Sequence, residues 1–240
     1  MNEDIKEELK HLIILGELKI IENYNKTALL INACDVSKKR YKKMKGEMFL
    51  STTQNIPSAL RLAMEIDTQF GKDELVEKYE NELIESICES YIVSSISIID
   101  GILEDMYEVL LKGEAIQYSD KQLENKVRQA WANDNMINYF DTKFNKPEKY
   151  EMELNEAFMR YKELRVIRHS LVHSNGVITS KNLKKLEEYL NSTPRERQTY
   201  AILNSKFYDD QDKIILNVHV LLSIRMYIFK FSSYLLNVIE

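Results

Sequence analysis

Two arginines and two histidines fall close together in the second half of the chain, and their side chains suit acid–base chemistry on a phosphate group. His169 and His173 are two of only four histidines in the chain, and Arg165 and Arg168 precede them. Histidine exchanges a proton near neutral pH, and arginine carries a fixed charge that suits phosphate oxygens. These residue types at this spacing predict cleavage of a phosphodiester without a metal ion.

We expect this segment to end an amphipathic helix. At about 100° per residue, the two arginines and two histidines share an arc of roughly 140°. Leu164, Ile167 and Leu171 fall on the opposite side and are expected to be buried. Asn175 and Gly176 are expected to stop the helix, because glycine accepts the left-handed conformation at a helix end. The second histidine then lies in the last turn, where the helix dipole favours a cationic imidazole.

A structural role for these charges is the competing interpretation. A single histidine on a helix is more often a surface or capping residue than a catalytic one. Either arginine could also be held in an ion pair. No acidic residue lies one helical turn from Arg165 or Arg168, and Glu163 faces elsewhere, so the carboxylate of such a pair would have to come from another helix.

The segment resembles the motif of the HEPN superfamily, in which an arginine and a polar residue are followed by a short, mostly apolar run and a histidine. Arg168 matches the arginine, His169 the polar residue and His173 the final histidine. The earlier apolar segment 91–101 resembles the core helix that often precedes this motif. Asn175 stands where some toxins of the family carry a tyrosine that is modified, so that mode of neutralisation is not expected here.

The resemblance implies an all-helical fold and a metal-independent endoribonuclease. It implies that Arg168, His169 and His173 are catalytic, with Arg165 as an added phosphate contact. It also implies a homodimer whose two motif helices face each other and line one cleft from both chains. Similar proteins act as toxins or in defence against phage, so growth arrest on expression and an antitoxin or defence-system partner are expected.

Length and composition fit a folded helical protein. The chain has 240 residues, of which 44% are apolar and 30% charged, and it contains few glycines and prolines. We therefore predict an all-α helical bundle forming a single domain over 1–240. The resemblance implies an N-terminal helical extension at 1–70 and an HEPN-like core at 72–240. The net charge of −5 argues against a generally basic nucleic-acid binder but allows a local basic site.

The expected location is the cytoplasm, with no contact to a membrane. The N-terminus is acidic and polar, unlike a signal peptide. The apolar segment 217–240 is interrupted by His219, Arg225 and Lys230, so it is interpreted as a core helix. Cys34 and Cys88 fit no disulfide or metal spacing.

Periodicity and turn residues divide the chain into expected elements. Helices are predicted at 4–24, 26–45, 58–70, 72–112 (one helix or two), 119–144, 147–175, 179–190 and 217–239. Short β-favouring runs at 200–203 and 213–216 predict a small β-hairpin before the C-terminal helix.

Two further features could bind ligands. A basic run near the end of the second expected helix could bind RNA phosphates, and its tyrosine could stack on a base; the residues assigned to substrate binding are Lys38, Lys39, Arg40, Lys42 and Lys43. The competing interpretation is a solvated helix face. His169 and His173 also have the spacing of a metal pair, for which Asp100 and Glu104 could supply oxygens, but a third ligand is not defined.

Three hypotheses follow. The first is an endoribonuclease that needs no metal or other cofactor and cleaves RNA by attack of the 2′-hydroxyl on the neighbouring phosphate. The second is a non-catalytic helical module that binds RNA, nucleotide or protein through the same Arg/His face. The third is a metal-dependent helical bundle that uses His169 and His173.

Overall fold

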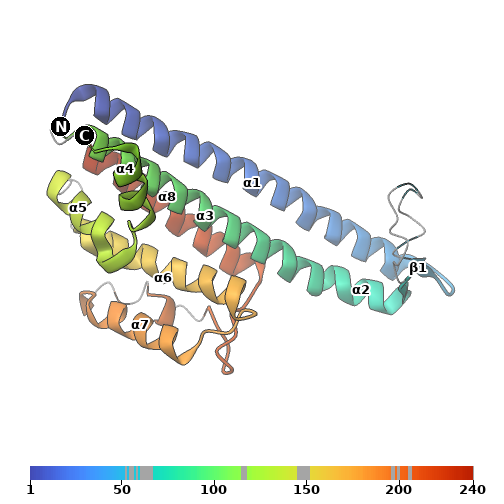
Figure 1. Cartoon of the computed structure of the whole chain (residues 1–240). Helices are drawn as coiled ribbons and strands as arrows, with labels where there is room; N and C mark the ends of the chain where they lie inside the picture. The colour runs from blue at the N-terminus through green and yellow to red at the C-terminus, as the bar shows by residue number, and fades with distance from the viewer. Residues whose placement is uncertain are drawn as a thin grey trace.

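The computed structural model is a bundle of long helices, as predicted from the sequence (Figure 1). It describes residues 1–51, 53, 57, 59, 67–114, 118–144, 152–195, 198, 201–204 and 207–239. The helices are α1 (Glu3–Lys43), α2 (Lys72–Glu80), α3 (Glu82–Lys112), α4 (Asp120–Arg128), α5 (Asn135–Lys143), α6 (Leu154–His173), α7 (Ser180–Asn191) and α8 (Val218–Ile239). The division into an extension and a core stays a prediction.

α1 is one continuous helix, so the prediction of two helices at 4–24 and 26–45 is wrong. The helix continues through the expected boundary, where the polar side chain of Asn23 is satisfied by α3. The Asn23 amide donates to the Ser94 and Ser95 hydroxyls, at 2.7 and 3.1 Å, and the Thr27 hydroxyl donates to the Asn23 carbonyl. α1 also approaches α3 closely at Gly16, where a Cβ atom would clash with the side chain of Ile102.

α3 is the central helix, and α1, α6 and α8 pack around it. The predicted segment 72–112 is divided at Asn81, whose backbone (φ −124°, ψ −75°) leaves the helical region and separates α2 from α3. Buried side chains of α3 recur on several sides of the helix, as expected for the centre of a bundle.

The predicted single helix at 119–144 is wrong in its middle. α4 begins with Ser119 in a capping box, as expected, but ends at Arg128. A short 3-10 turn, η2 (Ala132–Asp134), separates it from α5, and Asn133 and Asp134 have positive φ values of 50° and 57°. Asparagine and aspartate tolerate this left-handed conformation better than most residues. The break positions Trp131 beside α6.

α6 carries the Arg/His motif and ends where the sequence predicts. Asn175 and Gly176 both have positive φ, at 50° and 78°, and the Gly176 N–H donates to the Ser170 carbonyl at 3.0 Å. The expected start at Pro147 lies outside the described residues, and α6 begins at Leu154. Thr179 caps α7, as predicted, by accepting from the Asn182 N–H.

The hairpin before α8 is present, with a different first arm. Tyr208 and Ile214 form an antiparallel bridge, and Val177 pairs with Lys213 beside it. The predicted arm at 200–203 is wrong, because Ile202–Asn204 forms the 3-10 turn η4. A two-stranded antiparallel sheet, β1 (Phe49–Ser51) with β2 (Gln69–Gly71), joins α1 to α2. The predicted helix at 58–70 lies mostly outside the described residues, and its last two residues belong to β2.

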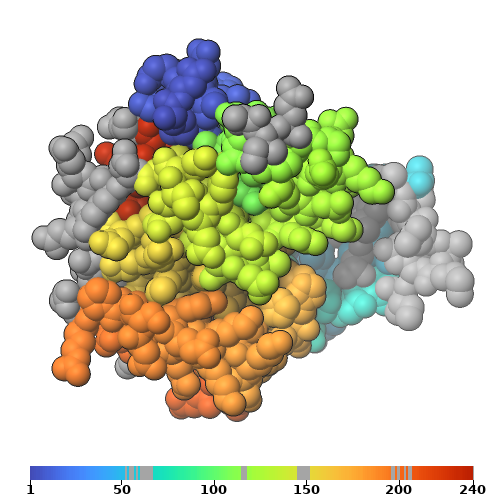
Figure 2. Space-filling model, turned by 60° about the vertical axis from the view of Figure 1, so that its left-hand side comes forward, coloured from blue at the N-terminus to red at the C-terminus, as the bar shows by residue number. Residues whose placement is uncertain are grey.

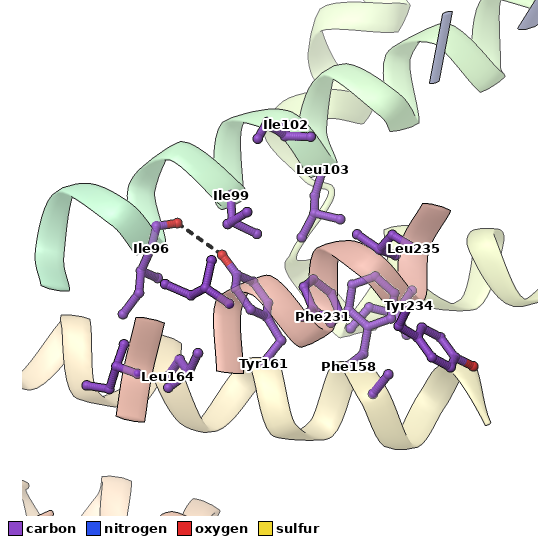
Figure 3. Close-up of a cluster of buried hydrophobic side chains, with 14 of the residues drawn as sticks. Ile96, Ile99, Ile102, Leu103, Phe158, Tyr161, Leu164, Phe231, Tyr234 and Leu235 are labelled. Carbon is purple, nitrogen blue, oxygen red and sulfur yellow. Dashed lines mark hydrogen bonds between the residues drawn. The ribbon is translucent and has the colours of Figure 1, made fainter. Parts of the chain in front are cut away.

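The core is formed where α3, α6 and α8 meet (Figure 3). The ring of Tyr161 stacks on Phe231 at 4.7 Å between centroids, and Phe158 meets Phe231 edge to face at 5.3 Å. The Tyr161 hydroxyl donates to the Ile96 carbonyl at 3.0 Å. This packing holds α6 in a defined orientation against α3, which matters for the polar side chains one turn further on.

Within the described residues, the stretch Lys72–Lys112 is the one helical segment long and apolar enough to cross a membrane by length and composition. The core helix of a soluble protein passes the same test. In this fold α3 contributes many buried side chains to the core. The predicted cytoplasmic location stays a prediction.

Candidate active site

α3 presents a carboxylate to the arginines of α6. Asp100 is 8% exposed and lies among apolar residues of α3. Arg165 Nε lies 2.9 Å from Asp100 Oδ1, and Arg168 Nη1 lies 3.6 Å from Asp100 Oδ2. The sequence analysis required any such carboxylate to come from another helix, and α3 supplies it. One carboxylate thus orients two arginines that stand one turn apart.

Tyr161 completes the surroundings of this carboxylate. Its hydroxyl lies 2.9 Å from Asp100 Oδ1 and donates to it. Burial and then the adjacent carboxylate raise the pKa of Tyr161 well above its usual value, so the hydroxyl keeps its proton. Asp100 is therefore surrounded by donors, as a buried carboxylate requires.

Arg165 is held on both sides. Its guanidinium carbon lies 3.5 Å from the centre of the Trp131 ring, within the range of a cation–π contact. The Trp131 Nε1 donates to Glu104 Oε1 at 2.8 Å, which fixes the indole on α3. The Arg165 side chain is 29% exposed. These contacts indicate that Arg165 mainly joins α6 to α3 and η2.

Arg168 is positioned but remains accessible. Its Nε donates to the Ser97 hydroxyl at 2.9 Å, and its side chain is 37% exposed. A guanidinium has five N–H donors in a rigid plane, so contacts at one edge orient the other edge. The contacts to Ser97 and Asp100 therefore aim Arg168 while leaving part of it open to an anion.

The two histidines form the outer part of the cluster. Both are exposed, and their ring centres lie 4.8 Å apart. Burial lowers the pKa of His169 below its usual value, and the nearby charges of His173 and Lys185 lower it further. His169 is therefore mostly neutral at pH 7 and can accept a proton. The four predicted side chains thus divide into arginines directed at α3 and histidines near α7.

Glu163 faces away from this cluster, as predicted from the sequence. It is 2% exposed, its Oε1 accepts from Arg160 at 2.7 Å, and its Oε2 accepts from the Ile202 N–H at 3.1 Å. Burial raises the pKa of Glu163 to about 7, although Arg160 opposes the shift. The carboxyl therefore ties α6 to η4 and titrates near neutral pH.

Titration of Glu163 predicts a pH-dependent stability. Because the folded-state pKa of about 7 exceeds the unfolded value, protonation favours the folded state. Its contribution is full below the unfolded pKa and is lost as pH rises through 7, at roughly 3 kcal/mol in total. We expect Glu163→Gln to remove this dependence. Denaturant unfolding at pH 5, 6, 7 and 8 measures it, with the exposed Glu187→Gln as control. Equal pH dependence in both variants would contradict it.

A metal site at the histidines finds little support among the described residues, where no group of three or more His, Cys, Asp or Glu side chains could hold a metal ion. The two carboxylates considered as further metal ligands have other partners. Asp100 meets the arginines and Tyr161, and Glu104 accepts from Trp131.

The basic run lies at the far end of α1, beside α2 and β1 and away from α6 (Figure 1). Lys38 and Lys42 lie 3.4 and 3.1 Å from Glu80, and Lys39 lies 2.6 Å from Asp35. Arg40 and Lys43 are exposed. The fold therefore does not bring these residues to the Arg/His cluster, and their role in substrate binding stays a prediction.

Asp100 is the functional residue whose role the sequence analysis missed, since it was weighed only as a metal ligand. The available signal was a single carboxylate within the apolar stretch 90–103. Such a group must find a charged or hydrogen-bonding partner when it is buried. Which residues supply that partner depends on the packing of α3 against α6.

Comparison with family models, with curated proteins and with solved structures finds no match to this chain. The resemblance to the HEPN superfamily therefore stays a prediction based on Arg168, His169 and His173. What the fold and site define is an all-helical protein with a positioned arginine beside two accessible histidines.

Proposed function

We propose that this protein is a metal-independent endoribonuclease of HEPN type. The observation that carries the proposal is the arrangement at the end of α6. Asp100 and Ser97 hold Arg168 at the surface. The rings of His169, the next residue, and His173 lie 4.8 Å apart. Two proton carriers beside an oriented cation meet the needs of phosphodiester cleavage without metal.

The proposed reaction uses the ribose as nucleophile. His169, neutral at pH 7, accepts the proton of the 2′-hydroxyl as its oxygen attacks the adjacent phosphorus. His173 donates a proton to the departing 5′-oxygen, and the opposite assignment of base and acid is also chemically consistent. Arg168 stabilises the charge that develops on the phosphate oxygens. The products are a 2′,3′-cyclic phosphate and a 5′-hydroxyl, which restricts the substrate to RNA.

A composite site across a two-fold dimer is part of the proposal. It would place Arg168 and His173 of one chain opposite the same residues of another. Few large apolar side chains are exposed near the motif; Val172 and Val177 are the ones found among the described residues. Because two cationic faces repel each other, we expect the two chains to pair weakly. The pairing should strengthen when bound RNA neutralises the positive charge.

Cleavage of RNA in excess chelator tests the function directly. We expect the wild type to cut single-stranded RNA and to leave cyclic phosphate ends. His173→Ala should be inactive, while the exposed His219→Ala on α8 should cut normally. Activity that disappears with chelator and returns with one metal would overturn the proposal in favour of the metal-dependent hypothesis.

A binding module is the second candidate, and one observation favours it. Both arginines already have protein partners, because Arg165 stacks on Trp131 and pairs with Asp100, and Arg168 contacts Ser97 and Asp100. Such arginines also occur in purely structural networks. RNA binding without cleavage by either the wild type or His173→Ala would support this candidate.

The electrostatic surroundings of His169 predict a shift in pH dependence. Lys185 on α7 is one of the charges that lower its pKa. We expect Lys185→Gln to raise the pKa of His169, so that the protonated form persists to higher pH. If His169 is the base, the acidic limb of the pH profile of kcat/KM also moves to higher pH.

Titration of the His169 ring by NMR measures this shift independently of activity. The exposed neighbour Lys184 supplies a matched control, since Lys184→Gln removes the same charge one residue away. An unchanged His169 titration in Lys185→Gln would contradict the assigned cause. If the pKa of His169 shifts but the pH profile of kcat/KM does not, the base is His173.

The proposed cellular role is that of a toxin or a phage-defence effector, held in check by an antitoxin or another partner protein. Induced expression should then arrest growth. His173→Ala should relieve the arrest at equal protein levels, because the arrest depends on cleavage.

A further inference from the structure

The outer face of α1 carries a stripe of exposed, large apolar side chains. Within the stripe, Leu29 is 70% and Leu18 56% exposed; the full set is Ile14, Leu18, Ile21, Leu29 and Val36. On a helix these five residues fall within an arc of about 80° centred on Asn25. Buried residues of α1, such as Leu9, Ile13 and Ile20, face α3 instead. Among the residues that the structure describes, these five side chains remain exposed.

The stripe is continued by α8. Leu222 and Met226 are 40% and 51% exposed, and together with Ile21 they line a groove of about 980 Å³. Surface apolar residues scattered singly are common, but a contiguous apolar patch along a helix marks an interaction surface. Figure 2 shows the beginning of α1 at the top of the molecule, on the opposite side from α7.

Four of the five apolar residues of the stripe form two pairs placed symmetrically about Asn25. If two copies of α1 pair antiparallel with Asn25 opposite itself, Ile14 faces Val36 and Ile21 faces Leu29 of the other copy. Leu18 then faces Asn32. A two-fold axis thus reproduces two apolar pairs, as an isologous interface requires, while Leu18 meets a polar side chain. A polar asparagine at such a position also specifies the register of a helix pair.

The charges at the two ends of α1 are complementary in the same arrangement. The first turns contain four carboxylates and one lysine, Glu3, Asp4, Lys6, Glu7 and Glu8. The last turns contain five basic residues, Lys38, Lys39, Arg40, Lys42 and Lys43, of which Lys38, Lys39 and Lys42 also pair with Glu80 or Asp35 of their own chain. An antiparallel pair places the acidic end of one helix beside the basic end of the other. Glu7 faces Lys43, and both lie on the line of the stripe.

We propose that the stripe on α1 binds a second copy of this chain, forming an antiparallel, two-fold helix pair centred on Asn25. The register of apolar residues and the opposed end charges both fit the chain's own α1. The interface shares no residue with the Arg/His cluster, so it forms without RNA and leaves the proposed site open. It holds whether or not the protein is a ribonuclease.

Sedimentation of the full chain without RNA tests the proposal. We expect a dimer at micromolar concentration, and Leu29→Glu should weaken dimerisation about tenfold or more. The adjacent Leu30 is the matched control: it is 54% exposed but points about 140° away from the centre of the stripe. Leu30→Glu should leave the dimer intact. Circular dichroism confirms that both variants fold.

Cysteine pairs test the register and direction. In the proposed arrangement Asn25→Cys cross-links to itself with a short bismaleimide, and Ile14→Cys mixed with Val36→Cys forms mixed cross-links. Ile14→Cys alone should form no cross-link, because residue 14 of one chain lies far from residue 14 of the other. Native Cys34 and Cys88 are buried. Self-linking of Ile14→Cys would overturn the antiparallel arrangement. A monomeric wild type at about 100 μM, or equal effects of Leu29→Glu and Leu30→Glu, would overturn the interface.

Discussion

Arg168→Ala is expected to lower RNA cleavage by about a hundredfold to a thousandfold, the range for losing one donor to a developing oxyanion. The guanidinium is anchored on α3 by Ser97 and Asp100, and part of it is exposed. Arg168→Lys should also lose about tenfold or more, because an ammonium cannot contact Ser97, Asp100 and a phosphate in one plane. Single-turnover cleavage at saturating RNA measures the chemical step.

Ser97→Ala is the control for positioning. It removes one hydrogen bond to Arg168 Nε but keeps the charge and the ion pair with Asp100. We expect a loss smaller than that of Arg168→Lys, with unchanged RNA affinity. If Arg168→Ala cleaves nearly as well as the wild type, the arginine serves only to hold α6 on α3. The ribonuclease proposal would then rest on the histidines alone.

Asp100→Ala is expected to destabilise the fold by about 2–3 kcal/mol. Its removal leaves Arg165 and Arg168 without a counter-ion and the buried Tyr161 hydroxyl with one acceptor fewer. The value is below that of a fully buried ion pair because both arginines remain partly in water. For a chain of this size, the melting temperature should fall by roughly 4–12 °C.

The matched control lies on the same helix. Asp105 is exposed, so Asp105→Ala should change stability by less than about 0.5 kcal/mol. Tyr161→Phe isolates the hydroxyl and should cost about 1 kcal/mol. We also expect Asp100→Asn to reduce the rate of RNA cleavage by more than its loss of stability explains. Arg168 loses the negative charge that orients its guanidinium. Equal melting temperatures for Asp100→Ala and Asp105→Ala would contradict the central role of this carboxylate.

Local sequence signals were sufficient for several helix ends and for the buried face of α6. The apolar periodicity that buries Leu164, Ile167 and Leu171 is present in the structure, and Asn175-Gly176 ends α6 with the predicted left-handed backbone. Thr179 and Ser119 begin α7 and α4. These features depend on hydrogen bonds within one turn, so neighbouring residues determine them.

Local signals failed where contacts distant in sequence decide the backbone. Two helices were predicted at 4–24 and 26–45, but Asn23 is satisfied by serines of α3 about 70 residues away, and the helix continues. Residues 129–135 favoured helix, yet the chain turns at Asn133 and Asp134, and Trp131 packs against Arg165. Neither tertiary contact has a signal in the local sequence.

The sequence by itself determined which residues can do chemistry here. Arg165, Arg168, His169 and His173 share one face of one helix because helical geometry is periodic. Only the tertiary structure decided how that face is divided. The packing of Tyr161 against α3 and α8 sets α6 so that Asp100 meets both arginines, while the histidines remain at the surface. The physical reason is that a buried carboxylate needs donors, and the approach of two helices determines which donors reach it.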